Sequence, residues 1–587
     1  VNFIGDGLGV NAQNRIFING QADGMIGPWA TINGTNLAMY SSVLGVYAGS
    51  GVEKGVAALG GTDASVIPDD ASASAVINTM GSIGPITLAN VWTNRILEVR
   101  QATEYASTVR MVQGVTNRTL QTSRISIGTG KASVTVGEND NDGALMALSN
   151  GGLLSLENLN ASSTLAVKSA IANNGATSSG LAKFGAGTVQ LSGSNSYAGA
   201  TLINEGNLEF GGPLAQKLVG SISGAGTLVK SGTNVLQLLG ASPLFTGPIY
   251  VNAGTIRPDQ NTAFGSTVSG TFIASGATLD VGCDKSVGGT RYNDNLNLGT
   301  EEFTISGSGV GGMGAIVNNG ASNQMSSVQR VVLSGDATFG GAMRWDIRNG
   351  YLLLNDHTLT KTGVCEIALP SIPIYPGSGQ MVINQGLLRI ESGTLMNGSA
   401  SNTVTVNSGA KLELYNLSPF VPAWSLIVND GGSFQGGTYN TTATNTSVWG
   451  GPVKLNGTAF MYGYSYSGMV NWTILGDISG PGTLIRTGTS SSTLWLMGTN
   501  NTYSGGTIVS NGTLYAKCPG SLPGYDTGKF TLANVGVLSI NSSDGSMGWT
   551  ADQLKSLHDA STFTTNTVVL NIDTSMSNLD YAGDFVK

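Results

Sequence analysis

Charged residues are scarce in this sequence. Lys, Arg, Asp and Glu make up 11% of its 587 residues, and the formal net charge is −8. A protein that binds nucleic acid needs a basic surface that displaces counterions from the phosphates, so the sequence predicts no nucleic-acid partner. No apolar run approaches the roughly 18 residues of a membrane-spanning helix, so we expect no membrane insertion by this segment.

Histidine and cysteine are rarer still, with two His and three Cys, namely Cys283, Cys365 and Cys518. No Cys-x-x-Cys or Cys/His spacing typical of a metal site is present, which predicts isolated buried thiols and neither a structural metal nor another cofactor. There is no Gly-x-Ser-x-Gly motif, and neither histidine has a nucleophile or metal partner in the sequence. These absences predict no catalytic residues and no enzymatic activity.

Glycine, by contrast, is abundant. Its 86 residues are about twice the usual share of roughly 7%. Within residues 180–211, Gly and Asn bound short runs in which apolar and polar residues alternate, as half-buried strands joined by tight turns require. Similar units occupy residues 221–259 and 477–517. Because one such unit cannot bury its own apolar face, the repetition favours stacking of each unit on the next.

The copies share short motifs. The first contains Gly185-Ala-Gly187-Thr188 and Tyr197-Ala-Gly199, and the third contains Gly480-Pro-Gly482-Thr483 and Tyr503-Ser-Gly505. The second has Leu244-Phe-Thr-Gly247 where the tyrosine belongs. On these residues the copies resemble the autotransporter-associated β-strand repeat of large bacterial surface and secreted proteins. The resemblance implies an exported right-handed parallel β-solenoid, hence a secreted or cell-surface bacterial protein whose signal or anchor is not in this chain.

A finer signature sets the period of the repeat. An aliphatic residue, two polar or small residues and a Gly precede apolar residues at alternate positions, as in residues 383–390. The Gly recurs at nearly equal intervals, from Gly386 to Gly409 and from Gly409 to Gly431. A constant period of about 23 residues fits one solenoid coil of three short strands, with Gly or Asn at a sharp corner and the apolar residues inside. The predicted fold is therefore all-β, a parallel β-solenoid (β-helix).

Three regions are expected along the chain. Residues 1–145 are the least repetitive and predict an irregular β-rich lead-in, with a strand at 96–99 and another at 15–18. Residues 146–548 form the solenoid, with insertions where the period fails, between 276 and 350 and between 431 and 512. Residues 549–587 predict a short helix and a terminal strand that opens further solenoid.

The helix is predicted from a capping box. Thr550-Ala-Asp-Gln553 places a hydroxyl and an amide three residues apart, where each side chain satisfies the other's backbone N–H. Leu554 and Leu557 then share one helical face. We expect this helix to cover one side of the solenoid.

Two groups of residues are candidate binding sites. Tyr462, Tyr464 and Tyr466 alternate and point the same way if their run is a strand. Such a row stacks on sugar rings, contacts another subunit, or packs inside the protein, and the sequence leaves all three open. Separately, Glu138, Asp140 and Asp142 precede Gly143 with the spacing of the front half of a calcium loop.

That loop is incomplete. A calcium loop needs a bidentate Glu at its twelfth position, which here is Ser149. The two interpretations are a weak calcium site and a solvated turn.

The sequence favours a non-enzymatic extracellular protein, structural or adhesive, on a bacterial surface. Self-association into a filament or sheath is expected because the strand-like residues 566–572 carry no Lys, Arg or Pro to discourage edge pairing. Other surface proteins or glycans are the remaining partners. The alternative is a polysaccharide-binding or polysaccharide-cleaving parallel β-helix. An enzyme of that kind should gather charged residues on one face, and in the sequence they look thinly spread with no cluster.

Overall fold

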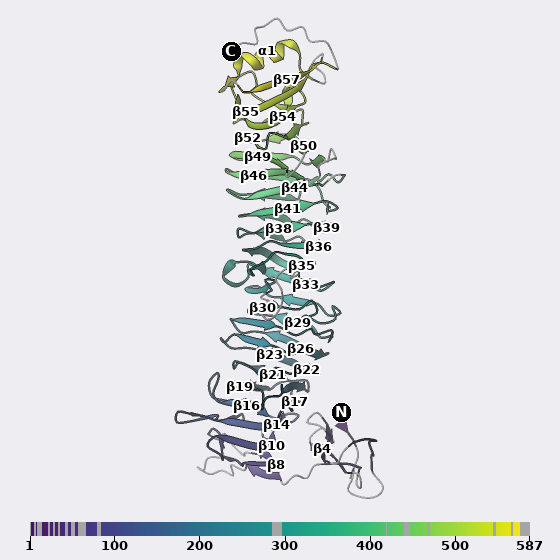
Figure 1. Cartoon of the computed structure of the whole chain (residues 1–587), viewed down its shortest axis with the longest axis vertical. Helices are drawn as coiled ribbons and strands as arrows, with labels where there is room; N and C mark the ends of the chain where they lie inside the picture. Colours follow the sequence, from purple (N-terminus) through teal and green to yellow (C-terminus); the bar gives the residue numbers. More distant parts are fainter. Residues whose placement is uncertain are drawn as a thin grey trace. The chain divides into compact units, whose positions relative to one another are not determined.

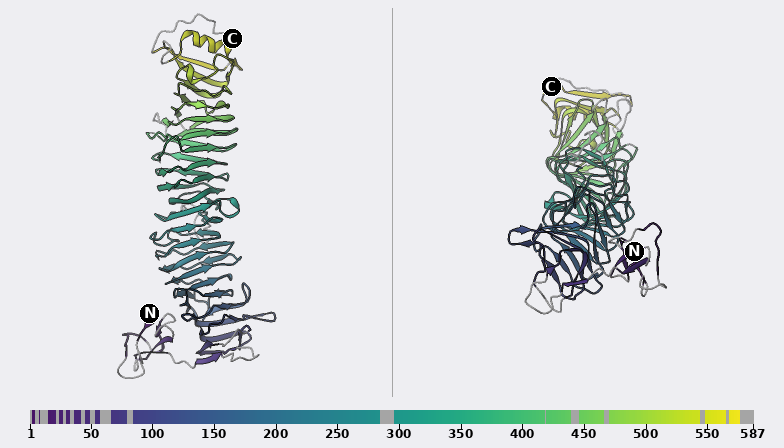
Figure 2. Two further views of the ribbon diagram at one scale, coloured as in Figure 1. Left: turned by 180° about the vertical axis from the view of Figure 1, so that it is seen from behind. Right: turned by 60° about the horizontal axis from the view of Figure 1, so that its bottom comes forward.

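The structure is a computed structural model that describes residues 2–4, 8, 15–21, 24–26, 30–32, 36–41, 45–48, 53–56, 66–78, 84–283, 296–417, 419–438, 446–465, 470–543, 548–564 and 567–575. About half of the chain is strand (51%) and little of it is helix (3%). The chain forms two compact units, Val1–Ala277 and Thr278–Lys587. Figures 1 and 2 show strands lying one above the next within each unit.

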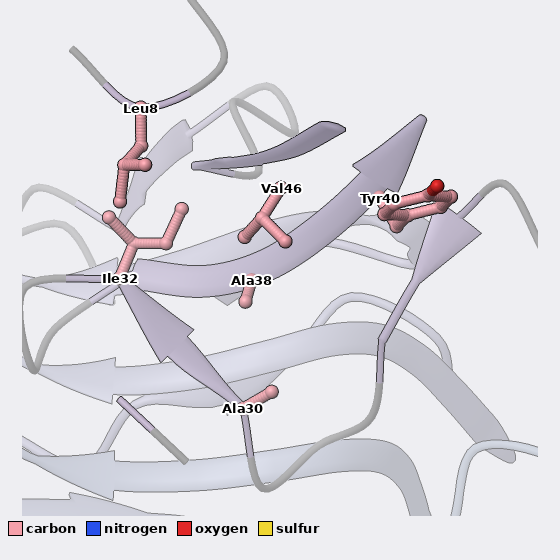
Figure 3. Close-up of a cluster of buried hydrophobic side chains, with 6 residues drawn as sticks. All are labelled: Leu8, Ala30, Ile32, Ala38, Tyr40 and Val46. Atoms are coloured by element: carbon pink, nitrogen blue, oxygen red, sulfur yellow. The ribbon is translucent and has the colours of Figure 1, made fainter. Parts of the chain in front are cut away.

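Unit 1 starts with a small sheet of β1 (Asn2–Phe3), β2 (Gly24–Met25), β3 (Thr31–Ile32), β4 (Asn36–Ser41) and β5 (Gly45–Ala48), most of whose pairs are antiparallel. Its small apolar core contains Leu8, Ala30, Ile32, Ala38, Tyr40 and Val46 (Figure 3). The expected strand at residues 15–18 does not form.

Parallel stacking follows in unit 1. One ladder contains β6 (Glu53–Val56), β8 (Asp70–Ile77), β10 (Thr93–Gln101), β14 (Thr119–Ile127), β17 (Leu153–Asn158), β20 (Gly180–Phe184), β22 (Thr201–Ile203), β25 (Ile222–Gly224) and β28 (Leu244–Phe245), joined by β16 (Ala144–Ala147) and β19 (Ala170–Ala172). A second contains β11 (Ser107–Val109), β15 (Val134–Val136), β18 (Thr164–Val167), β21 (Thr188–Leu191), β23 (Asn207–Phe210), β26 (Thr227–Lys230), β29 (Ile249–Val251) and β31 (Thr271–Ile273). A third contains β24 (Gln216–Leu218), β27 (Val235–Leu238) and β30 (Gly254–Pro258), and two short pairs are β7 (Val66–Ile67) with β9 (Thr87–Leu88) and β12 (Val112–Gln113) with β13 (Thr116–Asn117).

Unit 2 repeats this plan. Its first ladder contains β32 (Ala277–Asp280), β34 (Ile316–Asn318), β35 (Gln324–Gly341), β37 (Thr358–Lys361), β40 (Gln380–Ile383), β43 (Thr403–Val406), β45 (Ser425–Val428), β48 (Val453–Leu455) and β51 (Ile478–Ser479). The second contains β36 (Trp345–Leu353), β38 (Glu366–Leu369), β41 (Leu387–Glu391), β44 (Lys411–Tyr415), β46 (Gly432–Thr438), β49 (Thr458–Ser465), β52 (Thr483–Gly488), β54 (Thr507–Ala516), β55 (Phe530–Asn541) and β56 (Thr562–Phe563). The remaining strands are β33 (Glu302–Gly307), β39 (Pro373–Tyr375), β42 (Leu395–Met396), β47 (Thr446–Trp449), β50 (Val470–Ile474), β53 (Ser492–Leu496) and β57 (Val569–Asp573). Short 3₁₀ turns occupy Val310–Gly312 and Pro519–Ser521.

The predicted period is confirmed by the register. Met381 pairs with Val404, and Val404 with Leu426, so successive corners and successive paired residues recur at the same interval. All three side chains are buried, and the residues between them on each strand are half-exposed. Each aliphatic residue thus stacks on its counterpart in the next coil, and a fully buried one stabilises the fold by about 1.5–3 kcal/mol. The expected parallel β-solenoid is therefore present.

Corners take the expected left-handed backbone. Gly386 has φ +67°, a value that costs an L-residue about 1–2 kcal/mol. At the corner before Leu352, Asn349 adopts φ +59° in place of the glycine that follows it. Asn tolerates this region because its short polar side chain bonds locally, so either residue serves.

The insertions also appear where the period fails. Leu279 pairs with Ile316, and Phe434 pairs with Met461, and both steps are longer than a regular coil. Upstream, parallel pairing already joins β8, β10 and β14, whose sequences lack the regular glycine corners. The boundaries proposed at residues 145 and 548 stay predictions.

The predicted helix is confirmed as α1 (Ala551–Ala560). Thr550 accepts the backbone N–H of Gln553, whose side chain caps Thr550 in return, and Leu554 and Leu557 are buried. Within the described residues, no helix has the length and apolarity to cross a membrane. Cys283 and Cys365 are buried thiols outside any disulfide, as expected, whereas Cys518 is half-buried.

Candidate functional site

The outer face of the second ladder of unit 2 carries a continuous set of polar and aromatic side chains. On β41, β44, β46, β49 and β52 the register aligns one column of outward residues: Arg389, Glu413, Gln435, Tyr462 and Thr487. A neighbouring outward column contains Glu366, Leu387, Lys411, Ser433 and Phe460. These side chains come together because residues one coil apart in sequence lie side by side on adjacent strands.

Charged residues do cluster on this face, so the expectation of thinly spread charges is wrong. Arg389 lies 2.6 Å from both Glu366 and Glu413. Arg344 lies 2.7 Å from Glu366 and 2.9 Å from Asp346. Arg348 and Glu391 extend the same network. The sequence did not show this charge cluster because most of its residues are about one coil apart along the chain.

Burial gives the network its electrostatic character. The Glu413 side chain is 0% exposed. Burial raises the pKa of Glu413, and the nearby Arg389 and a hydrogen bond with Tyr464 only partly oppose that shift. Burial would lower the pKa of Arg389, but Glu413 and Glu366 more than offset it and raise the pKa above its ordinary value. Arg389 is therefore a fixed cation that holds the two carboxylates.

The predicted tyrosine row lies beside this network. Tyr462 and Tyr464 both occur on β49 with ring centroids 6.3 Å apart, and Tyr466 lies outside the described residues. Phe460 precedes them on the same face, which the sequence analysis missed although it continues the alternation. Phe460 and Tyr462 are 37% and 36% exposed.

Tyr464 has a different role from its neighbours. Its hydroxyl accepts a hydrogen bond from Nη2 of Arg389 at 3.0 Å, so the side chain reaches back across β46. Gly437 makes this possible, because a Cβ there would lie 3.1 Å from the Tyr464 ring and 2.1 Å from a Glu413 oxygen. Tyr464 thus packs within the protein, which is one of the interpretations left open by the sequence.

A groove of about 670 Å³ runs over these strands. It is lined by Val364, Glu366, Gly386, Leu387, Gly409, Ala410, Lys411, Gly431, Ser433, Gln435, Phe460, Tyr462, Tyr464 and Thr487. Of these, Glu366 alone carries a carboxylate, and it is ion-paired with Arg344 and Arg389. Hydrolysis of a glycosidic bond by acid–base catalysis needs a pair of carboxylates beside the substrate. Among the described residues that line the groove, no such pair is present.

At the suggested calcium loop the three carboxylates are engaged separately. Glu138 pairs with Arg110 at 2.8 Å, Asp140 accepts a hydrogen bond from Ser192, and Asp142 accepts the backbone N–H groups of Glu138 and Asn139. Among the residues that the structure describes, no three His, Cys, Asp or Glu side chains gather as a metal site would need.

Buried cations at the coil corners form a second feature that the sequence analysis missed. Lys361 donates to the carbonyls of Thr362 and Gly363 in its own coil, and to that of Gln385, 24 residues on, in the next. Lys183 does the same and reaches Glu205, 22 residues on. Each of these corners has the sequence cation-x-Gly, the signal that could have revealed it. The same signal occurs at Lys230 and Arg486, whose side chains also donate to corner carbonyls.

The shared tyrosine of the repeats has a defined partner. The Tyr197 hydroxyl bonds the Thr201 hydroxyl at 2.9 Å, and the Tyr503 hydroxyl bonds that of Thr507 at 2.6 Å. The second copy has the buried pair Phe245 and Ile249 at the corresponding positions. Both hydroxyls are absent together, so no buried polar group is left without its partner.

Comparison with known proteins agrees with this architecture. The passenger-associated-transport-repeat model matches residues 181–210, 223–257 and 484–516, within the three predicted copies. The chain is 26% identical over 408 residues to the adhesin BmaC autotransporter of Brucella suis biovar 1 (strain 1330). That match covers 61% of this chain and 10% of the relative, so the chain spans about a tenth of the relative's length. No solved structure matches it. The chain is therefore a parallel β-solenoid that carries passenger-associated-transport repeats.

Proposed function

We propose that this chain is a non-enzymatic adhesive segment of a bacterial passenger protein, secreted or held at the cell surface. The observation that carries the proposal is the set of passenger-associated-transport repeats together with similarity to a protein named as an adhesin. The groove supports binding, because its one carboxylate is already paired with two arginines.

Adhesion is tested with beads coated with the purified chain and incubated with host-cell monolayers. Saturable attachment above that of beads coated with heat-denatured chain is expected. Equal attachment of both kinds of bead would overturn the proposal. In parallel, incubation with neutral and acidic polysaccharides should release no reducing ends, whereas release abolished by Glu366→Gln would establish the polysaccharide-cleaving alternative.

Self-association into a filament or sheath stays a prediction. Its supporting feature is β57, which pairs with β55 and carries no Lys, Arg or Pro. Such an edge is a template for pairing with another strand. Sedimentation of the chain over a range of concentrations tests it, and a constant monomer mass would contradict it.

A further inference from the structure

We propose that the groove of unit 2 binds a neutral oligosaccharide whose pyranose rings stack on Phe460 and Tyr462. The inference rests on the proposed adhesive function and deepens it by naming the class of ligand. The occupant follows from four properties of the groove: its aromatic rings, its hollow, its charge and its length.

The rings provide a stacking surface. Phe460 and Tyr462 occupy alternate positions of β49 and keep more than a third of their surface in water. Tyr464, on the same face, is instead held by Arg389. A pyranose ring presents a face of C–H groups that packs on an aromatic ring, with its hydroxyls directed outward at the rim. Covering two exposed rings in this way removes apolar surface from water.

Small residues line much of the hollow. Ser433 is the neighbour of Phe460 in its outward column, whereas the larger Gln435 is the neighbour of Tyr462 in the next. The groove is also lined by Gly386, Gly409, Ala410 and Gly431, so little bulk fills it on the preceding coils. Ser433, Gln435 and Thr487 also line the groove. Ser433 and Gln435 are largely buried, with Gln435 Nε2 donating to Ser433 Oγ at 3.1 Å, and Thr487 brings a hydroxyl that suits those of a sugar.

The charge of the groove favours a neutral ligand. Glu366 is neutralised by Arg344 and Arg389, and these cations are in turn paired with Asp346 and Glu413. Among the described residues that line the groove, Lys411 is the one cation. A sulfated or uronic-acid chain is bound by a surface with several unpaired cations, because their summed field attracts it. This groove does not offer such a surface.

The length of the groove suits a short chain of sugars. It extends from β38 to β52, and stacked strands lie about 4.8 Å apart, so it spans roughly 24 Å. One step between strands is close to the length of one pyranose residue in an oligosaccharide. A chain lying along the stack would thus meet a new outward side chain at each step, and at β49 it would meet Phe460 and Tyr462 side by side.

The test uses the full chain on a printed array of glucose, galactose, mannose and N-acetylglucosamine oligomers beside sulfated and uronic-acid glycans. Binding to at least one neutral series is expected, with an affinity that changes less than about twofold between 0.05 and 0.5 M salt because no charge pair is formed. Tyr462→Ala and Phe460→Ala should each weaken it about tenfold or more, as loss of a stacked ring does. Tyr462→Phe should keep it within about threefold because the ring remains.

The matched control is Tyr375→Ala, which removes a 50% exposed aromatic ring of unit 2 that does not line the groove, and it should leave affinity unchanged. Far-ultraviolet circular dichroism confirms that each variant is folded. Binding confined to anionic glycans and lost in Lys411→Ala, or neutral binding that survives both aromatic substitutions, would overturn the inference. No glycan binding at all would also overturn it.

The bead assay keeps the two proposals apart. If Tyr462→Ala beads adhere to cells as well as wild-type beads, the adhesive function stands and the glycan inference fails. If wild-type beads do not adhere while the array binding is lost in Tyr462→Ala, the glycan site stands and the adhesive function fails.

Discussion

Replacement of Lys361 by Met tests whether a buried cation fastens one coil to the next. Lys361 is 1% exposed, and its Nζ donates to the carbonyls of Thr362, Gly363 and Gln385 at 2.9, 2.8 and 2.9 Å. Met is similarly long and unbranched, so it fills the same space without a donor. The variant therefore removes the hydrogen bonds and leaves the packing nearly unchanged.

The magnitude follows from these contacts. A hydrogen bond from a charged group contributes about 1.5 kcal/mol or more to stability, so three of them amount to about 4.5 kcal/mol. Burial lowers the pKa of Lys361, which shows that holding the ammonium away from water has a cost. Met avoids that cost, so the expected net loss is smaller than this sum, on the order of 3 kcal/mol.

Hydrogen exchange is the appropriate assay because a solenoid unfolds locally as well as globally. Peptides that span residues 359–390 should exchange on the order of a hundredfold faster in Lys361→Met, the equivalent of about 3 kcal/mol. The control is Lys454→Met, an exposed lysine on β48 of the same ladder, which should change exchange by less than about 0.5 kcal/mol. Equal exchange in the two variants would refute the assignment of Lys361 as a tie between coils.

Three further predictions concern the same architecture. Burial lowers the pKa of Lys183 to about 7 from 10.5, so between these values the folded chain has released a proton that the unfolded chain keeps. The urea midpoint of the wild type, relative to that of Lys183→Met, should therefore rise with pH from about 7 towards 10. Midpoints of the two proteins that change with pH in the same way would contradict this. Tyr503→Phe should lower the free energy of unfolding by about 1 kcal/mol in the wild-type chain, and by much less in a chain that already carries Thr507→Val. Additive losses in this double-mutant cycle would show that the two hydroxyls are not coupled. In urea unfolding, Gly386→Ala should be at least about 2 kcal/mol more destabilising than Gly409→Ala. Both glycines have positive φ, but only a Cβ at residue 386 would meet carbonyl oxygens, at 2.5 Å. Equal losses of stability would show that this clash is not the cause.

The fold could be predicted because the period of the repeat determines which residues pair in successive coils. Once Gly386, Gly409 and Gly431 are recognised as successive corners, the alternating apolar residues after each corner must stack, and Leu388 does pair with Leu412. A shift by one residue would turn these side chains to solvent, so the pattern admits one solution. The cap of α1 was predicted on separate grounds, because a capping box is a local feature of four residues.

The groove could not be predicted by the same route. Its charges lie on outward positions, where neither alternation nor glycine constrains the residue. Applying the coil period to Arg389 and Glu413 would have shown that they are neighbours, since no insertion separates them. Tyr462 is harder, because the step from Gln435 is longer than one regular coil. Because of that insertion, the coil period does not predict that Gln435 and Tyr462 are neighbours, and their pairing is known only from the structure.

Buried lysines were missed for a different reason. Lys and Arg are almost never fully buried unless they are paired, so an alternating pattern assigns them to the surface. Here the partners are backbone carbonyls of the corner, which no side-chain motif reveals. The exception is systematic, because Lys183, Lys361 and Arg486 each stand two residues before a glycine. A corner leaves carbonyls without strand partners, and a cation at the end of the strand supplies the donors.

Stability and binding therefore depend on different positions of the same coil. Inward aliphatic residues, corner glycines and buried cations hold each coil to the next, and a change at Lys361 or Gly386 should alter unfolding. Outward residues such as Tyr462 keep about a third of their surface in water, so a change there should alter affinity more than it alters the free energy of unfolding. Glu413 is the informative exception, because it faces outward but is buried beneath Tyr464 and paired with Arg389. Glu413→Gln should lower both the free energy of unfolding and the affinity for the sugar. That result would show that the ion-pair network holds the aromatic side chains in position.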